Sequence, residues 1–228
     1  MLEESRNTAS SWTQSPIYCL DFEGSRQSGI VEYGLVRLSG GEVTELSTRL
    51  CRSTAAISHW ETATHNIRDE DVADADLFVA DWELFRDKRA QGPFAAHNAS
   101  FENNLIKSVW PFTNLCPNFM THSMDIDWGP WLDTCSLYRS FFPGLESYRL
   151  SELVQSFHLE SLLSRWAEQW CPSRRRTFHC APYDALASAA LLGNLNNFEG
   201  AKSLTLPQLL QWSQPGGTDH ARDQLELL

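Results

Sequence analysis

Residues 17–27 read IYCLDFEGSRQ, an apolar run followed by two acids, a glycine and polar residues. Successive side chains of a strand point to opposite faces, so Asp21 and Glu23 would share one face and Phe22 would lie on the other. Two neighbouring carboxylates repel each other, and one of them keeps its proton unless a cation is supplied. The stretch therefore predicts either a metal site at the end of a buried strand or an edge strand whose acids are solvated.

The segments that follow this strand alternate between strand and helix patterns. Residues 29–38 and 42–52 show the alternation of strands, with SGG at 39–41 as the turn between them, so three antiparallel strands are expected. PFAAH at 93–97 reads as a short buried strand, and residues 99–110 read as a helix after it. Strands that alternate with helices predict an α/β fold with a mixed sheet flanked by helices.

Apolar residues recur at helical spacing in five further segments. The expected helices lie within residues 65–88, 133–142, 147–158, 159–170 and 182–195, with Ser147 as a candidate cap and the last segment as the final helix. Residues 110–132 contain three tryptophans and four proline or glycine residues, which interrupt helices. This segment predicts a long ordered loop.

Length and composition are typical of one domain with extended ends. The chain has 228 residues, 42% of them hydrophobic, which is enough to bury a core without disulfides. We expect a disordered leader over residues 1–15, a single domain over 16–212 and a flexible tail over 213–228. The six cysteines form no CxxC pair and have no regular spacing, so neither a zinc site nor a disulfide framework is indicated.

The net charge and the hydropathy exclude two classes of protein. A net charge of −11 argues against nonspecific coating of nucleic acid, because such binding depends on Lys and Arg. It is compatible with a nuclease, since clustered acids that hold metal add to the negative total. No uncharged run approaches the roughly 20 residues of a membrane span, and no signal-peptide pattern is present. We expect a cytoplasmic protein with no membrane partner.

Two later segments supply further acids and a histidine. AAHNASFENNL at 95–105 places Glu102 in the first turn of a helix, directly after a buried strand. FHCAPYDALASAALL at 178–192 places His179 five residues before Asp184, at another helix start. Sites are often built at such strand ends and helix starts along one sheet edge. The alternative is that Glu102 and Asp184 are first-turn acids favoured by the helix dipole, and that His179 is a surface or core histidine.

In this order, the segments resemble the DEDD 3′ to 5′ exonucleases of the proofreading-subunit type, in the DEDDh branch of the ribonuclease H-like superfamily. The D-x-E motif of that family is matched by Asp21 and Glu23. Its H-N-x-x-F-D motif is matched by His97, Asn98 and Phe101, with Glu102 in place of the aspartate. Its H-x-A-x-x-D-A motif is matched by His179, Ala181, Asp184 and Ala185. The resemblance covers roughly residues 17–199 and implies a ribonuclease H-like mixed sheet with three antiparallel strands followed by parallel strands.

The resemblance implies an exonuclease domain that removes nucleoside 5′-monophosphates from a 3′ end. Two divalent ions, Mg²⁺ or Mn²⁺, would stabilise the attacking and leaving oxygens, and such hard ions prefer carboxylate ligands. The implied metal ligands are Asp21, Glu23, Glu102 and Asp184. His179 would take the proton from the attacking water, a task suited to imidazole near neutral pH. Because glutamate is one methylene longer than aspartate, Glu102 predicts weakened activity or a preference for Mn²⁺.

The candidate substrate contacts are Phe22, Gly24, His97, Asn98 and Phe101. Phe22 and Phe101 could stack on a terminal base, or pack in the core as phenylalanine more often does. His97 and Asn98 would orient the second motif and the substrate, or form a hydrogen-bonded turn. The expected substrate is single-stranded DNA or a frayed duplex end, in DNA repair or proofreading.

Two short segments and two alternative functions complete the predictions. SRRRT at 173–177 would lie along a phosphate backbone or on a solvated face. QLELL, Gln224 to Leu228, resembles the peptide that docks replication proteins on the sliding clamp. The alternatives to a DNA exonuclease are a catalytically weakened nuclease-fold module that binds nucleic-acid ends or a partner protein, and an oligoribonuclease that acts on short RNA.

Overall fold

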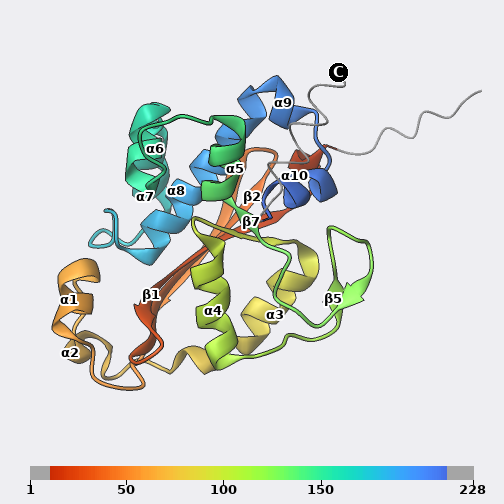
Figure 1. Ribbon diagram of the computed structural model, residues 1–228. Coiled ribbons are helices and arrows are strands. Elements are labelled where there is room, and N and C mark those ends of the chain that lie inside the picture. Colours follow the sequence, from red (N-terminus) through yellow and green to blue (C-terminus); the bar gives the residue numbers. More distant parts are fainter. Residues whose placement is uncertain (1–10, 215–228) are drawn as a thin grey trace, which may run out of the picture.

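A mixed sheet of five strands, in the order β3-β2-β1-β4-β7, forms the centre of the molecule in a computed structural model that describes residues 11–214 (Figure 1). The antiparallel strands are β1 (Ile17–Ser25), β2 (Gly29–Ser39) and β3 (Glu42–Leu50). The parallel strands β4 (Phe94–Ala96) and β7 (Leu132–Asp133) extend the sheet from β1. The expected mixed α/β sheet, three antiparallel strands followed by parallel strands, is confirmed.

Helices cover both faces of the sheet and enclose two cores (Figure 1). The helices on the first face are α5 (Thr134–Phe141), α6 (Leu150–Ser156), α7 (Glu160–Trp170) and α8 (Ala181–Asn194). The second face carries α3 (Trp82–Gln91) and α4 (Ala99–Val109). Along β1, Cys19 enters the first core, whereas Leu20 and Phe22 enter the second. The alternation expected for this strand is therefore confirmed.

Short elements connect this framework. They are η1 (Trp12–Gln14), α1 (His59–His65), α2 (Asp69–Val72), η2 (Phe78–Asp81), β5 (Cys116–Pro117), β6 (Met124–Asp125), η3 (Leu195–Asn197), α9 (Glu199–Lys202) and α10 (Leu206–Trp212). Ser58 caps the start of helix α1, and its side chain forms a reciprocal capping box with Glu61. Helices α9 and α10 follow α8, so the prediction that α8 is the final helix is wrong.

The single helix expected within residues 65–88 is also wrong. This segment forms α2, the 3₁₀ turn η2 and then α3, because the backbone around residue 76 is bound by other groups. The Asp76 carbonyl accepts hydrogen bonds from the backbone of Arg52 at 3.0 Å and from the guanidinium of Arg49 at 2.8 Å. Phe78 and Phe85 still meet in the second core, with ring centroids 4.9 Å apart. The apolar pattern therefore predicted the burial of Phe78 and Phe85, which belong to two different elements, but Val79 of the same pattern is 51% exposed.

The cap expected for α6 is not formed by Ser147. Arg149 occupies the N-cap position, and the Ser147 hydroxyl accepts a hydrogen bond from the Arg149 backbone at 3.2 Å. Ser147 therefore shapes the turn before the helix.

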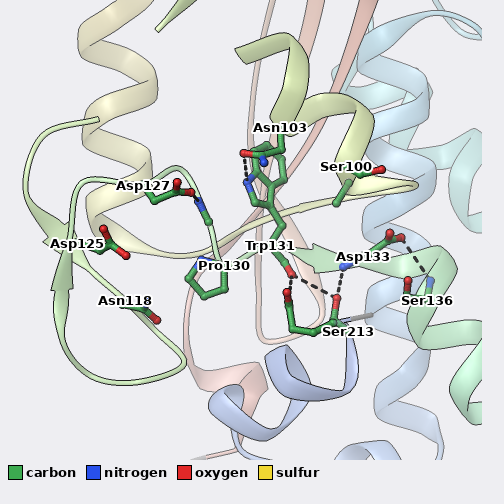
Figure 2. Close-up of a pocket in the computed structure, with 13 residues that line it drawn as sticks. Ser100, Asn103, Asn118, Asp125, Asp127, Pro130, Trp131, Asp133, Ser136 and Ser213 are labelled. Carbon is green, nitrogen blue, oxygen red and sulfur yellow. Dashed lines mark hydrogen bonds between the residues drawn. The ribbon is translucent and has the colours of Figure 1, made fainter. Parts of the chain in front are cut away.

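Both ends of the folded part extend beyond the expected boundaries. Trp12 is 1% exposed, and its indole N–H donates to the Ala201 carbonyl at 2.9 Å. Figure 2 shows the Ser213 hydroxyl bound to the backbone N–H of Asp133 and to the Trp131 carbonyl. Residues 11–15 and 213–214 thus pack with the domain rather than with the leader and tail. The clamp-like peptide Gln224–Leu228 lies outside the described residues.

Residues 110–132 form the expected ordered loop, with the short pair β5 and β6 inside it. The buried guanidinium of Arg89 ties the loop to α3. It donates to the carbonyls of Pro117 and Trp128 at 2.9 Å each and of Gly129 at 2.5 Å. The charge is therefore surrounded by neutral acceptors.

The cysteines and the helices agree with what the composition predicts. All six cysteines are buried free thiols, as expected for small apolar residues. Within residues 11–214, none of the helices combines the length and the apolar composition needed to cross a bilayer.

Candidate active site

Four acids lie at one edge of the sheet, on three different elements. Asp21 and Glu23 occupy the end of β1, Glu102 lies in the first turn of α4 after β4, and Asp184 lies in the first turn of α8. The parallel pairing of β1 with β4 brings the ends of these strands together. The fold thus gathers the acids of the three sequence motifs.

Gly24, which follows the acid pair, has a conformational role. Its φ is +123°, and the pairing with β2 shifts register between Glu23 and Gly24. A Cβ at Gly24 would lie 2.1 Å from the Gly29 carbonyl oxygen, so a larger residue cannot be accommodated there. The strand can therefore bend directly after its acids. A contact between Gly24 and substrate stays a prediction.

His179 lies beside two of the acids. One side-chain ligand atom each from Glu23, His179 and Asp184 lies within 4.8 Å of the others. His179 is exposed and has a φ of +63°, and its backbone N–H donates to the Asp184 carboxylate at 3.0 Å. This hydrogen bond fixes the loop before α8, so that the imidazole lies at the edge of the acidic cluster.

The surroundings of the four acids disfavour their ionised forms. Burial, together with the neighbouring Asp184 and Glu32 carboxyls, raises the pKa of Glu23 to about 8. Burial likewise raises the pKa of Asp184 to about 7. The pKa values of Asp21 and Glu102 are raised well above their ordinary range, first by burial and then by the other carboxyls. At neutral pH the cluster therefore either retains protons or needs a cation.

The donor set fits a divalent cation. Glu102 Oε2 and Asp184 Oδ1 are buried and accept no hydrogen bond from any residue within 11–214. Such oxygens are costly to bury unless something satisfies them. The four carboxylates are hard ligands of the kind that Mg²⁺ and Mn²⁺ prefer. Asp21, Glu23, Glu102 and Asp184 are the residues that would hold the ion.

The sequence interpretation missed a fifth acid, Glu32, which faces Glu23 across the β1–β2 pair. Its carboxylate accepts hydrogen bonds from the Arg175 guanidinium at 2.7 and 2.5 Å, and from the Ala181 backbone N–H at 2.8 Å. Glu32 thereby anchors the first residue of the helix that carries Asp184. A glutamate inside the apolar run IVEYGLV was the one available signal.

Within the basic run at 173–177, Arg175 fits neither expectation, whereas the exposed Arg174 and Arg176 fit a solvated face. Arg175 forms the buried ion pair with Glu32 and also donates to the His65 carbonyl at 2.8 Å. Arg176 donates to the carbonyls of Cys171 and Glu168, at the end of α7. Arg174 is exposed and forms no ion pair with the residues that the structure describes.

A cavity of about 510 Å³ opens beside the acids and is lined by Asp21, Asp184, His179, His97 and Asn98, together with residues from the start of α6. His97 Nε2 lies 2.9 Å from the Tyr148 carbonyl, which can only accept, so this nitrogen carries the proton. His97 Nδ1 lies 2.9 Å from the Thr134 hydroxyl, and burial lowers the pKa of the imidazole. The ring thus fixes the end of β4.

The remaining candidate substrate contacts differ in exposure. Phe22 is 3% exposed and packs edge-on against Phe78 at 5.3 Å, so its expected stacking on a base is wrong and it belongs to the core. Phe101 is 50% exposed on α4 and can contact a ligand. Asn98 is exposed with a φ of +63°, and its backbone N–H donates to Asp133 at 3.1 Å. The turn and the ligand-contact interpretations of Asn98 are therefore compatible.

A second cavity, of about 530 Å³, lies between α4 and the tryptophan-containing loop (Figure 2). None of the four clustered acids lines it. Its polar groups bind each other: the Trp131 indole donates to Asn103 at 3.1 Å, and Asp127 accepts the Gly129 N–H at 2.8 Å. The arrangement suited to chemistry is therefore the acidic cavity.

Comparison with known proteins gives matches to nucleases. The model of the RNase_T family, described as exonuclease, matches residues 19–192. The 3′-5′ exonuclease DinG of Staphylococcus epidermidis is 28% identical over 134 residues, which are 57% of this chain and 13% of that protein. The chain thus spans only a small part of the length of this curated relative.

Solved structures share the fold. Exonuclease X, in complex with 5′ overhanging duplex DNA, superposes with a TM-score of 0.62 at 23% identity, over 87% of this chain and 99% of that one. E. coli exonuclease I, in complex with a dT13 oligonucleotide, gives a TM-score of 0.58 at 13% identity, over 80% and 41% of the two chains. A 3′-exonuclease solved with a histone mRNA stem-loop gives 0.55 at 14% identity, over 82% and 66%.

Proposed function

Because the chain belongs to the RNase_T exonuclease family, we propose that it hydrolyses nucleic acid from the 3′ end and releases nucleoside 5′-monophosphates one at a time. The observation that carries the proposal is the group of four carboxylates, three of them buried, next to the exposed His179 and beside a cavity. Acids whose pKa values are raised by burial, at one edge of an α/β sheet, are typical of functional sites.

The carboxylates have the role of metal ligands in this proposal. Two divalent ions, Mg²⁺ or Mn²⁺, would supply charge stabilisation for the attacking and leaving oxygens. Asp21 and Glu23 project together from β1, and Asp184 and Glu102 approach from the first turns of their helices. The buried acceptors Glu102 Oε2 and Asp184 Oδ1 support this role, because they lack hydrogen-bond donors among residues 11–214.

His179 has the role of general base. Its side chain lines the cavity that contains Asp21 and Asp184, and it is exposed to solvent, so it can accept a proton from the attacking water and release it. The hydrogen bond from its backbone to Asp184 couples the position of the base to that of a metal ligand.

The proposed substrate is single-stranded DNA or a frayed duplex end, with short RNA second. The exposed Asn98, which lines the cavity, and the half-exposed Phe101 of α4 support binding of a terminal nucleotide, because aromatic side chains stack on unpaired bases. Exonuclease X and E. coli exonuclease I were solved with DNA, and another neighbour with RNA. DNA repair, proofreading and a cytoplasmic location stay predictions, as does a clamp contact through Gln224–Leu228.

The test is cleavage of a 5′-labelled single-stranded DNA and a matched RNA, with Mg²⁺, with Mn²⁺ and with EDTA. The wild type should give a ladder that shortens from the 3′ end, and Asp21→Asn should abolish it. Asp74→Asn, at an exposed acid outside the cluster, is the matched control and should cleave normally. Absence of cleavage on both substrates with both metals would contradict the proposal, and retained binding of ends would then favour the non-cleaving module.

A further inference from the structure

Two arginines next to the acidic cavity have guanidinium groups available to an anion from solution. The Arg149 side chain is 82% exposed, and its ion pair with Glu152 measures 3.6 Å at the surface, where such pairs are weak. Arg139 is exposed and forms no ion pair within residues 11–214. These two positive charges are therefore largely uncompensated.

The two arginines lie along one concave surface. The acidic cavity is lined by Arg149 as well as by Asp21 and Asp184. A neighbouring cavity of about 520 Å³ is lined by Arg139, Tyr148, Arg149 and Asn98. Because Asn98 and Arg149 border both cavities, the surface leads from the acids past Arg149 to Arg139.

Arg139 is held in place by a fixed aromatic ring. Its guanidinium carbon lies 4.3 Å from the centre of the Tyr148 ring. The Tyr148 hydroxyl donates to the Phe142 carbonyl at 2.9 Å and accepts the Gly144 N–H at 3.1 Å, so the ring is positioned from the other side. A guanidinium stacked in this way keeps its N–H groups free for phosphate oxygens.

Several other cations are paired within the protein. Lys88 is paired with Glu45, Lys107 with Asp127, and Arg175 with Glu32. With a net charge of −11, the chain as a whole repels a nucleic-acid strand. Free arginines beside the acids would offset that repulsion where the strand must approach.

We propose that Arg149 and Arg139 bind successive phosphates of the substrate strand on the 5′ side of the scissile bond. This inference rests on the proposed function, since an exonuclease that acts on the last bond of a 3′ end leaves the rest of the strand on the 5′ side. Arg149, at the acidic cavity, contacts the nearer phosphate, and Arg139 contacts the next one. The pair lets the enzyme grip strands of any sequence, because phosphate contacts carry no base information.

The experiment compares Arg149→Gln, Arg139→Gln and the double variant with the wild type on two substrates. One is a single-stranded oligonucleotide of about 15 nucleotides, and the other is the p-nitrophenyl ester of thymidine 5′-monophosphate, which has no upstream phosphate. The matched control is Arg165→Gln, at an exposed arginine of α7 that lines neither cavity. Arg149→Lys, which retains the charge, tests for rescue.

Each single Gln variant should lower kcat/KM on the oligonucleotide about tenfold at low salt, mostly through KM, and leave the small ester unchanged. The slope of log kcat/KM against log salt should become shallower by about 0.7 for each lost phosphate contact. Arg149→Lys should restore the slope. Equal losses on both substrates, or a slope identical to that of Arg165→Gln, would overturn the proposal and leave the exonuclease assignment intact.

A binding measurement tests the arginine contacts independently of the proposed exonuclease activity. Fluorescence anisotropy of a labelled oligonucleotide in EDTA gives the same salt slope without cleavage. If the wild type cleaves neither substrate, the proposed function fails, and the binding slopes of the variants still decide whether the two arginines hold the strand. Unchanged binding slopes in both variants would refute the arginine contacts.

Discussion

Glu23 and Glu32 face each other across β1 and β2, yet these two buried acids differ in their partners. Glu32 is 2% exposed and receives the Arg175 guanidinium and the Ala181 N–H, all from its own chain. Glu23 is 9% exposed and has no ion pair within residues 11–214, and burial raises its pKa to about 8. An acid with a resident cation is part of the architecture, whereas an acid without one depends on a cation from solution.

The same contrast extends to the neighbours of each acid. Arg175 also binds the His65 carbonyl, so the Glu32 pair joins β2 to α1 and, through Ala181, to α8. Around Glu23 are Asp184, Glu102 and Asp21, which add negative charge. Loss of a charged side chain should therefore destabilise the fold at the Glu32 site but not at the Glu23 site.

The largest effect is expected from Arg175→Ala, which leaves Glu32 buried and unpaired. Removal of one partner of a buried pair costs about 3 to 5 kcal/mol, so the urea midpoint should fall sharply. Arg174→Ala, at the exposed neighbour, is the control and should change the free energy of unfolding by less than about 0.5 kcal/mol. Equal effects of the two substitutions would contradict the structural role of Glu32. The double variant Arg175→Ala with Glu32→Gln should recover part of the loss.

Asp184→Asn should lower activity without lowering stability, in contrast to Arg175→Ala. The amide oxygen can still accept the His179 N–H, but the charge that would hold the cation is lost. Exonuclease activity should fall at least about a hundredfold, equivalent to about 3 kcal/mol of transition-state stabilisation. In EDTA the urea midpoint should stay constant or rise, because a repulsive charge is gone. A destabilised and still active Asp184→Asn would show that this acid belongs with Glu32.

The metal-free protein should lose stability as the pH rises. The pKa values of Glu23 and Asp184 in the folded chain are about 8 and about 7, above their ordinary values of 4.5 and 3.8. Between these limits the folded state binds more protons than the unfolded state, so the free energy of unfolding falls with rising pH. We expect a loss of at least about 2 kcal/mol between about pH 5.5 and 8.5 in urea titrations with EDTA.

Two controls accompany this pH profile. Saturating Mg²⁺ or Mn²⁺ should flatten it, since an ion that binds only the folded state stabilises it most where the acids are ionised. Glu23→Gln should reduce the slope without metal. A profile that rises with pH in the metal-free wild type would contradict the raised pKa values.

Glu102→Asp should have the smallest effect. Shortening the side chain by one methylene withdraws the carboxylate from Glu23 and leaves a small void at a position only 3% exposed. Activity should fall about three- to tenfold, equivalent to about 1 kcal/mol, and the ratio of rates with Mn²⁺ and Mg²⁺ should change. Glu102→Gln keeps the side-chain length but removes the charge, so it distinguishes the effect of length from the effect of charge. Faster cleavage by Glu102→Asp would show that the longer acid limits the wild type.

Local sequence patterns predicted the elements that local forces decide. The alternation of residues 17–25 placed Cys19 and Leu20 on opposite faces, because the period of a strand is a property of the backbone. The motifs likewise predicted which acids the sheet edge gathers, since each follows a strand or opens a helix. The burial of Trp12 could not be predicted from local patterns, because its hydrogen-bond partner Ala201 is 189 residues away.

What the sequence determined by itself was therefore the strands, the helix starts and the set of acids at one sheet edge. Only the tertiary structure decided that Glu32 and Arg175, 143 residues apart, neutralise each other and that Glu23 has no such partner within residues 11–214. The physical reason is range: propensity and side-chain periodicity act between near neighbours, whereas the pairing of buried charges depends on which distant segments the closed fold brings within a few ångströms.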